Sequence, residues 1–210
     1  MGGGKLVIID DGSKDNTYSI MKECQCEMPD FIALTKENSG HGATVLFGYQ
    51  YALSHHADYI FQTDSDGQTL PEEFEQFWRQ RHTYDMIIGY RRNREDGLSR
   101  KFVTKVLKLT IRMCFGVKVS DANTPFRLMK ADTLRENIGL IPKDYNLSNV
   151  IIAVIYEKKK LAVKYIPITF RSRQGGANSI NFMKIVTIGI AAVKDFKMIN
   201  QIIKGDEKNA

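Results

Sequence analysis

Residues 58–68 constrain this chain most, because a short apolar segment there runs directly into two carboxylates one residue apart. Tyr59, Ile60 and Phe61 form an apolar run between turn residues, which is typical of a buried strand in a parallel sheet. Asp64 and Asp66 follow at the carboxyl end of that run. Ligands of open α/β sheets bind at this edge, so the pattern predicts a strand that delivers two acidic side chains to a binding site.

Two carboxylates this close together predict a metal site. Like charges at short range repel each other unless a cation or hydrogen-bond donors offset them. Mg²⁺ or Mn²⁺ suits the position, because Mg²⁺ takes one or two protein carboxylates and fills its other positions with water and substrate phosphates. Asp64 and Asp66 are therefore the expected metal ligands. The alternative is an ordinary loop, since Asp-Ser-Asp-Gly is also good turn chemistry.

Strand and helix patterns alternate along the chain. Strands are expected at residues 5–9, 31–35, 58–63, 85–89, within 121–129 and at 161–170. Helices are expected from 15 or 16 to 27 and at 43–55, 71–82, 99–115, 147–156 and 180–203. This alternation at short spacing predicts an α/β fold with a mainly parallel sheet flanked by helices on both faces. Pro167 predicts that the last strand lies at an edge, or that the proline stands at the strand's outer end.

Length and composition limit the architecture and the partners. With 210 residues, 43% of them hydrophobic, the chain is long enough for one well-packed α/β domain. Its net charge of +6 suits phosphate-bearing ligands or an anionic membrane, and nucleic acid is not expected because Lys and Arg form no aromatic-interleaved cluster. Three cysteines and no secretory signal indicate a cytoplasmic protein with reduced thiols. No run approaches the roughly 18 apolar residues of a membrane span.

Other polar clusters also follow strand patterns. Asp10 and Asp11 end the first strand, and Gly40 and Gly42 in the next connection would let the backbone approach a ligand closely. Arg91 lies just past the strand at 85–89, where a cation could meet a phosphate, and a solvated loop is the alternative. Residues 171–179 form a basic, glycine-rich loop that could close over an anion.

As a set, these segments resemble the family 2 glycosyltransferases of the GT-A fold. The resemblance rests on the acidic strand ends at residues 10–13 and 64–66, separated by the Asn-Ser-Gly-x-Gly-Ala segment at 38–43. It continues in the family's order through residues 89–91, 121–129 and 173–179, so it covers nearly the whole chain. The later segments look most like the dolichol-phosphate mannose synthase branch, whose acidic motif is often followed by a glutamine, as Gln68 is here.

The resemblance implies a nucleotide-sugar donor and a divalent metal. Asp10 and Asp11 would contact the base and ribose of the donor, with Gly40 close to the same ligand. Asp64 and Asp66 would hold the metal that bridges the diphosphate. Phosphates of donor and acceptor would be neutralised or oriented by Gln68, Arg91 and Arg173. A nucleoside diphosphate is a poor leaving group until metal and arginine offset the charge it gains, and displacement at the anomeric carbon would invert its configuration.

Two carboxylates are candidates for the acceptor side. Asp144 stands where relatives carry Glu-Asp before a helix and would deprotonate an acceptor hydroxyl, and the alternative is that it caps that helix. A polyprenyl phosphate is already ionised and needs no base. In that case Asp121 would orient the acceptor or order the metal site, and it ranks ahead of Asp144.

The sequence departs from the family pattern at its start. Relatives begin with a strand, a Pro-x-Tyr-Asn-Glu type turn and a helix before the Asp-Asp-Gly-Ser strand, and this sequence begins at that second strand. The resemblance therefore predicts an N-terminally truncated GT-A fold whose sheet has a gap or is rearranged. Either the chain is a fragment, or another segment or a partner chain fills the slot. The affinity for the donor would depend on whether that slot is filled.

We expect residues 1–179 to form the catalytic domain and residues 180–210 a basic amphipathic helix and tail. That helix could lie on anionic lipid as a peripheral membrane contact, or it could pack on the domain with a solvated lysine face. The expected location is the cytoplasm, at the inner face of the membrane if the helix binds lipid.

The leading hypothesis is an inverting, metal-dependent glycosyltransferase of cell-envelope glycan biosynthesis. It would move a sugar from a UDP-, GDP- or dTDP-linked donor to a polyprenyl phosphate or a cell-surface glycan. One alternative is a nucleotidyltransferase, although the glycines at residues 2–4 precede the first strand, whereas a phosphate loop follows its strand. The other is a truncated, non-catalytic relative that binds nucleotide.

Overall fold

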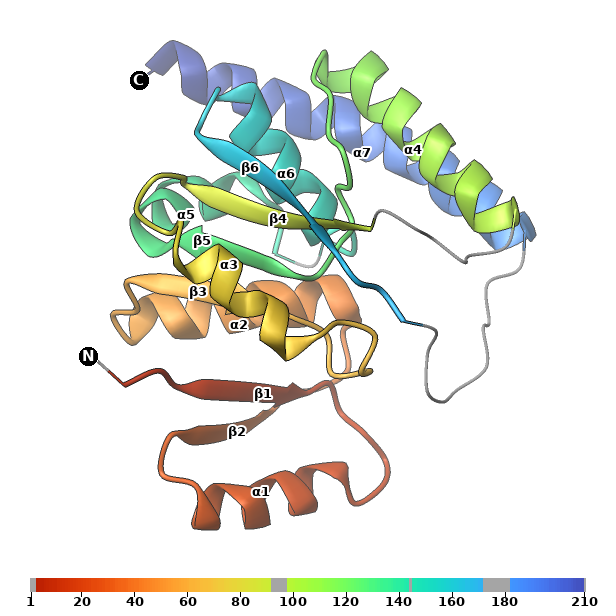
Figure 1. The fold of residues 1–210 in the computed structure, drawn as a ribbon. Coiled ribbons are helices and arrows are strands. Elements are labelled where there is room, and N and C mark those ends of the chain that lie inside the picture. Colours follow the sequence, from red (N-terminus) through yellow and green to blue (C-terminus); the bar gives the residue numbers. More distant parts are fainter. Residues whose placement is uncertain (1–2, 92–97, 144, 172–181, 210) are drawn as a thin grey trace. The chain divides into compact units, whose positions relative to one another are not determined.

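The computed structural model describes residues 3–91, 98–143, 145–171 and 182–209, and the chain divides into two compact units (Figure 1). The first unit comprises Met1–His56 with Pro142–Ser148, and the second comprises Ala57–Ile141 with Asn149–Ala210. The expected domain boundary between residues 179 and 180 lies outside the described residues.

The first unit is built on two parallel strands. Its elements are β1 (Leu6–Asp10), α1 (Thr17–Glu27), β2 (Phe31–Thr35) and α2 (His41–Ser54). In the register of β1 and β2, Asp10 lies opposite Thr35, so both strands end at the same edge. Met21 of α1 packs with Phe31 and Ala33 of β2 in a small apolar core, which fixes α1 on this sheet.

The second unit contains a four-stranded sheet with the order β3-β5-β4-β6. Its elements are β3 (Tyr59–Gln62), η1 (Pro71–Glu73), α3 (Phe74–Trp78), β4 (Met86–Arg91), α4 (Leu98–Phe115), β5 (Arg127–Lys130), α5 (Ala131–Asn137), η2 (Ile138–Leu140), α6 (Ser148–Lys158), β6 (Val163–Ile168) and α7 (Phe182–Asn209). The described strands thus form two separate sheets. Pro167 lies in the edge strand β6, as predicted.

The α/β class is confirmed, but the four-stranded sheet is mixed. β6 runs parallel to β4, whereas β5 runs antiparallel to both β3 and β4. The reason lies in residues 116–126, which carry the chain from the end of α4 to the carboxyl end of β4, where Gly89 N donates to Phe126 O at 2.8 Å. β5 therefore starts at the edge where β4 ends, and Asp121 is brought to that edge.

The helices differ from expectation at three points. The last helix, α7, continues to Asn209, past its expected end at residue 203. The helix expected at 71–82 is a 3₁₀ turn, η1, followed by the short α3, because the backbone after Trp78 bonds three residues back, as in Thr83 N to Gln80 O at 3.0 Å. The seven-residue α5 was not predicted, since so short a segment carries little helical periodicity.

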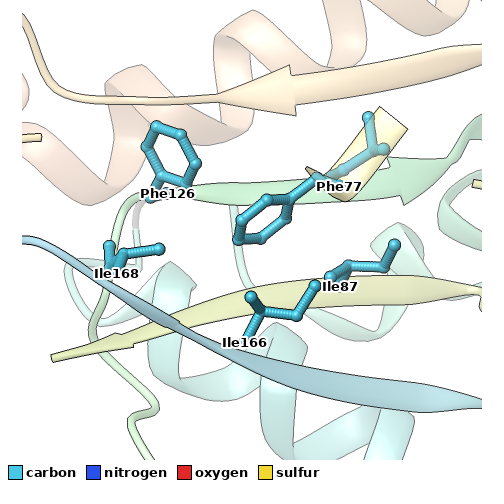
Figure 2. Packing of buried hydrophobic residues seen from close by; sticks show 6 residues of the cluster. Phe77, Ile87, Phe126, Ile166 and Ile168 are labelled. Atoms are coloured by element: carbon cyan, nitrogen blue, oxygen red, sulfur yellow. The ribbon is translucent and has the colours of Figure 1, made fainter. Parts of the chain in front are cut away.

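One face of the four-stranded sheet is covered by an apolar cluster. Figure 2 shows the Phe77 ring from α3 reaching toward Ile87 of β4, Ile166 of β6 and Phe126. The rings of Phe77 and Phe126 lie edge to face with centroids 5.1 Å apart, a geometry that adds about 0.5–1.5 kcal/mol to the gain from burial. This packing holds α3, and with it the connection that follows β3, against the sheet.

Candidate functional site

The two expected metal ligands lie on a turn directly after β3. Asp64 and Asp66 are both partly buried, and Oδ1 of Asp66 accepts a hydrogen bond from Gln68 N at 3.1 Å. The hydroxyl groups of Thr63 and Thr69 lie 2.9 Å apart and close the base of the turn. We call residues 64–68 the acidic turn. Its position at the carboxyl end of β3 is as predicted.

The donor set of the acidic turn fits a hard divalent cation. The turn offers two carboxylates, and the side chain of Gln68 donates from Nε2 to Arg171 O at 2.9 Å, which leaves its carbonyl oxygen as an acceptor. Within the described ranges, no three His, Cys, Asp or Glu side chains gather to hold a metal without help. A cation here would therefore draw its remaining oxygens from water and phosphate, as Mg²⁺ commonly does.

Arg91 and Asp121 form a buried ion pair, a partnership that the sequence did not predict. Nε and Nη2 of Arg91 donate to the two carboxylate oxygens of Asp121, each at 2.8 Å, and only 9% of either side chain is exposed. The guanidinium also lies over the ring of Phe170, 4.9 Å from its centroid. Bidentate pairing fixes the orientation of both groups and neutralises the arginine charge locally.

Arg127 is a residue whose role sequence reasoning missed. Its fully buried guanidinium donates to the carbonyl oxygens of Thr124 and Ala122, both at 3.1 Å, and to that of Asn149 at 2.9 Å. These bonds fix the segment that carries Asp121 before β5. The available signal was an arginine directly before the apolar Leu-Met pair of a strand, where a charge is costly unless it is fully hydrogen-bonded.

Residues 169–171, which follow β6, are held by side chains from the connection after β3. The carboxylate of Glu73 accepts Thr169 N in both oxygens, at 2.9 and 3.0 Å. Arg171 N donates to Gln68 O at 2.8 Å, and Nε2 of Gln68 donates in return to Arg171 O. The structure therefore uses Gln68 to join two backbone segments.

In the first unit, Asp10 is a hydrogen-bonded carboxylate at the end of β1. Its oxygens accept Ser13 N at 3.1 and 3.3 Å and the hydroxyl of Thr35 at 2.8 Å. Hydrogen bonds from Ser13 and Thr35 lower the pKa of Asp10 below its ordinary value of 3.8, although burial opposes the shift. Asp10 is therefore ionised at neutral pH.

Asp11 ties the end of β1 to the segment before α2. Its carboxylate accepts the Lys36 ammonium, Ser39 N at 3.0 Å and Gly40 N at 2.9 Å. Burial raises the pKa of Asp11, but the hydrogen bonds from Lys36 and the Ser39 amide outweigh it, so the net shift is downward. Contact of Asp10 and Asp11 with a nucleotide stays a prediction.

The glycines at the start of α2 serve close backbone packing. Gly40 has a φ of +87°, which favours glycine, and its amide is one of the two that Asp11 accepts. A Cβ on Gly42 would lie 2.3 Å from Tyr145 O and 2.4 Å from Asn146 O, so only glycine fits. For Gly42, the close approach predicted from sequence is thus made to the protein's own backbone.

The remaining predicted residues, Asp144 and Arg173, lie outside the described residues, as does most of the basic loop at 171–179. Among the described candidates, the structure brings Arg91 to Asp121, Gln68 to Asp66, and Asp11 to Gly40.

Comparison with known sequences gives one family. The sequence model of the family described as Glycosyl transferase family 2 matches residues 5–138. The undecaprenyl-phosphate 4-deoxy-4-formamido-L-arabinose transferase of Pectobacterium atrosepticum is 24% identical over 189 residues, covering 88% of this chain and 55% of its own. The protein of the same name from Salmonella paratyphi B is 26% identical over 193 residues, with the same coverage. The chain thus spans about half the length of these relatives.

Solved structures share the fold. Glucosyl-3-phosphoglycerate synthase from Mycobacterium tuberculosis, solved with Mn²⁺, UDP-glucose and phosphoglyceric acid, superimposes with a TM-score of 0.63 at 14% identity, covering 93% of this chain and 68% of that one. TarS from S. aureus gives a TM-score of 0.53 at 13% identity, covering 95% and 60%. At these identities the likeness shows the fold alone, and that fold is the expected one.

Proposed function

This chain belongs to glycosyl transferase family 2, and we propose that it moves a sugar from a nucleotide-sugar donor to a polyprenyl phosphate. The observation that carries the proposal is the acidic turn, whose two carboxylates follow β3 directly. Relatives named as undecaprenyl-phosphate transferases support the choice of acceptor, and a structural neighbour solved with UDP-glucose and Mn²⁺ supports the choice of donor.

In this proposal Asp64 and Asp66 would hold Mg²⁺ or Mn²⁺, and the side-chain carbonyl oxygen of Gln68 would be a further oxygen available to the cation. When bound, the cation offsets the negative charge that the leaving diphosphate gains. Asp10 and Asp11 would contact the base and ribose of the donor, with the Gly40 backbone close to the same ligand. The hydrogen bonds that lower the pKa of Asp10 keep its carboxylate ionised, which suits it to accept hydrogen bonds from base or ribose.

The chemistry is a displacement at the anomeric carbon. An oxygen of the acceptor phosphate forms the new bond as the bond to the donor diphosphate breaks, and the electron pair leaves with the nucleoside diphosphate. The configuration inverts. Because the acceptor is already ionised, neither Asp121 nor Asp144 needs to remove a proton. Asp121 instead positions Arg91 through its bidentate bond, and Arg91 and Arg173 orient phosphates.

A lipid acceptor implies contact with a membrane, and α4 offers a surface for it. None of the helices in the described ranges is both long and apolar enough to cross a bilayer. On α4, Val106, Leu109 and Met113 share one face and are 44%, 59% and 77% exposed. We call these three residues the α4 stripe. Ile111 and Phe115, on a different face, are buried.

The charge around the α4 stripe favours anionic lipid as its partner. The helix sequence contains five basic residues and no acidic ones, and Lys105, Lys108 and Arg112 are exposed next to the stripe. α4 packs beside α7, where the rings of Phe115 and Phe196 lie 5.3 Å apart (Figure 1). α7 also exposes apolar and basic side chains, namely Met198, Ile202, Lys194, Lys197 and Lys204. Basic residues beside apolar ones are typical of interfacial helices, and we propose the inner, cytoplasmic face of a membrane as the place of action.

A transfer assay tests the proposal. The purified chain is incubated with Mn²⁺, undecaprenyl phosphate and UDP-, GDP- or dTDP-sugars labelled in the sugar, and label is counted in the organic extract. We expect one donor class to label the lipid and EDTA to abolish the labelling. Binding of a donor without transfer or hydrolysis, by a folded protein, would favour a non-catalytic relative. Release of pyrophosphate would favour a nucleotidyltransferase.

A further inference from the structure

Each of residues 169–171 contacts a different part of the protein: η1, the end of β4 and the acidic turn, in that order. Thr169 N points at the Glu73 carboxylate, and Arg171 exchanges a backbone and a side-chain hydrogen bond with Gln68. Between them, the ring of Phe170 lies under the Arg91 guanidinium. Contacts in this short segment thus reach the connection after β3 and the end of β4.

These hydrogen bonds form a continuous series from Glu73 to Asp66, which is a candidate metal ligand. Glu73 fixes Thr169, and the segment from 169 to 171 is too short to let Arg171 move independently. Arg171 fixes Gln68, and the backbone N of Gln68 donates to Oδ1 of Asp66 at 3.1 Å. A hydrogen bond to a carboxylate is stronger than one between neutral groups, so the bonds to Glu73 and to Asp66 are stronger than those between Gln68 and Arg171.

We propose that Glu73 is a positioning residue for the acidic turn. Both of its oxygens accept Thr169 N, so its carboxylate acts on the turn through residues 169–171. It thereby sets the conformation from which Asp64 and Asp66 bind a cation. This inference rests on the proposed metal role of those two residues. Because the coupling is reciprocal, cation binding at the turn also protects the amides of residues 169 and 171.

If Glu73 acted through its charge alone, its replacement would affect cation affinity in a different way. Any carboxylate near a cation raises its affinity, whichever way the carboxylate is bonded. Glu72 is the matched control, since it is the neighbouring residue, carries the same charge and is exposed. Glu73→Gln removes the charge but keeps one acceptor oxygen for Thr169 N, so it separates charge from hydrogen bonding.

The test combines amide exchange, followed by NMR for single residues, with Mn²⁺ affinity measured from the paramagnetic resonance of the free ion. In Glu73→Ala we expect exchange at both Thr169 and Arg171 to accelerate about tenfold, the equivalent of one lost hydrogen bond, and Mn²⁺ affinity to fall by a similar factor. In Glu72→Ala each quantity should change less than about twofold. Glu73→Gln should lie between the two variants, and thermal unfolding checks that all of them fold.

Faster exchange at Thr169 alone, with exchange at Arg171 and Mn²⁺ affinity unchanged, would overturn the proposal. Equal losses of Mn²⁺ affinity in Glu72→Ala and Glu73→Ala would do the same, because charge alone would then explain them. If the wild-type protein binds no Mn²⁺, the metal proposal fails, and the exchange rate at Arg171 still decides whether Glu73 holds the turn. If Glu73→Ala does not fold, Glu73→Gln must show the same joint acceleration at both amides.

Discussion

At the scale of single residues, the ion pair between Arg91 and Asp121 changes what each group can do. The resemblance implied an arginine for phosphates and a carboxylate for the acceptor. The structure joins them with two bonds of 2.8 Å in a nearly buried setting. Breaking such a pair from one side leaves an uncompensated charge, which is costly in a low-dielectric site.

Replacement of Asp121 should therefore destabilise the fold. We expect Asp121→Asn to lower the free energy of unfolding by about 3 kcal/mol, because Arg91 would keep its charge without a counterion. Urea denaturation measures the change. Asp132→Asn is the control, since it removes an Arg135 pair whose aspartate is 91% exposed, and such pairs contribute about 0–1 kcal/mol. Equal losses in the two variants would contradict the buried pairing.

Asp10 and Asp11 predict a pH dependence for the first unit. Their pKa values are lower in the fold than the ordinary 3.8, so their contribution to stability is present above pH 3.8 and is lost as pH falls toward the lower folded values. In Asp11→Asn this acid-induced loss should be smaller, because one of the two carboxylates no longer titrates. Unfolding followed by circular dichroism between pH 5 and pH 2 measures both proteins. Parallel curves for the two would show that the Asp11 pKa is not lowered.

The sequence located several acidic residues but not their partners. Asp10, Asp64 and Asp66 could be predicted because apolar runs mark strands and ligands bind where those strands end. The partners come from distant positions. Arg91 and Asp121 are 30 residues apart, Glu73 and Thr169 are 96 apart, and Gln68 and Arg171 are 103 apart. Side-chain pairing over such separations depends on the tertiary fold, which local patterns do not encode.

At the scale of elements, local signals predicted every described strand but not every direction. β3 and β4 follow from apolar runs with turn residues on both sides. The direction of β5 depends on where residues 116–126 carry the chain, and no periodicity marks that. This reversal matters for the site, because it brings Asp121 to Arg91.

The α4 stripe predicts binding to anionic membranes. We expect the protein to sediment with vesicles containing phosphatidylglycerol. The double variant Leu109→Glu with Met113→Glu should reduce that binding at least about tenfold, because two apolar side chains that would enter the lipid are lost and two repulsive charges are added. Vesicle sedimentation at low salt measures it.

The matched control is Ile20→Glu, which makes the same change at an apolar side chain of α1 that is 56% exposed. It should bind vesicles almost as well as the wild type. The wild type could instead fail to bind anionic vesicles and form a dimer that the Leu109→Glu and Met113→Glu changes disrupt. The α4 stripe would then be an interface between copies of this chain.

At the scale of the whole molecule, the family match and the fold are shown, and the acidic turn is the feature on which the proposed function rests. The family match covers residues 5–138, which include both acidic strand ends, Arg91 and Asp121. Composition gives no sign of a nucleic-acid partner and does not name the donor, because base and sugar are selected by individual contacts and not by overall charge.

We propose that the acidic turn binds a nucleotide through a divalent cation. Calorimetric titration of UDP, GDP and dTDP into the purified chain, with Mn²⁺ and then with EDTA, tests it most directly, alongside Asp66→Ala and the surface control Asp132→Ala. We expect one nucleotide to bind with Mn²⁺, EDTA to abolish the binding, and only Asp66→Ala to lose it. Binding that survives both EDTA and Asp66→Ala, or no binding of any nucleotide by the folded protein, would contradict it.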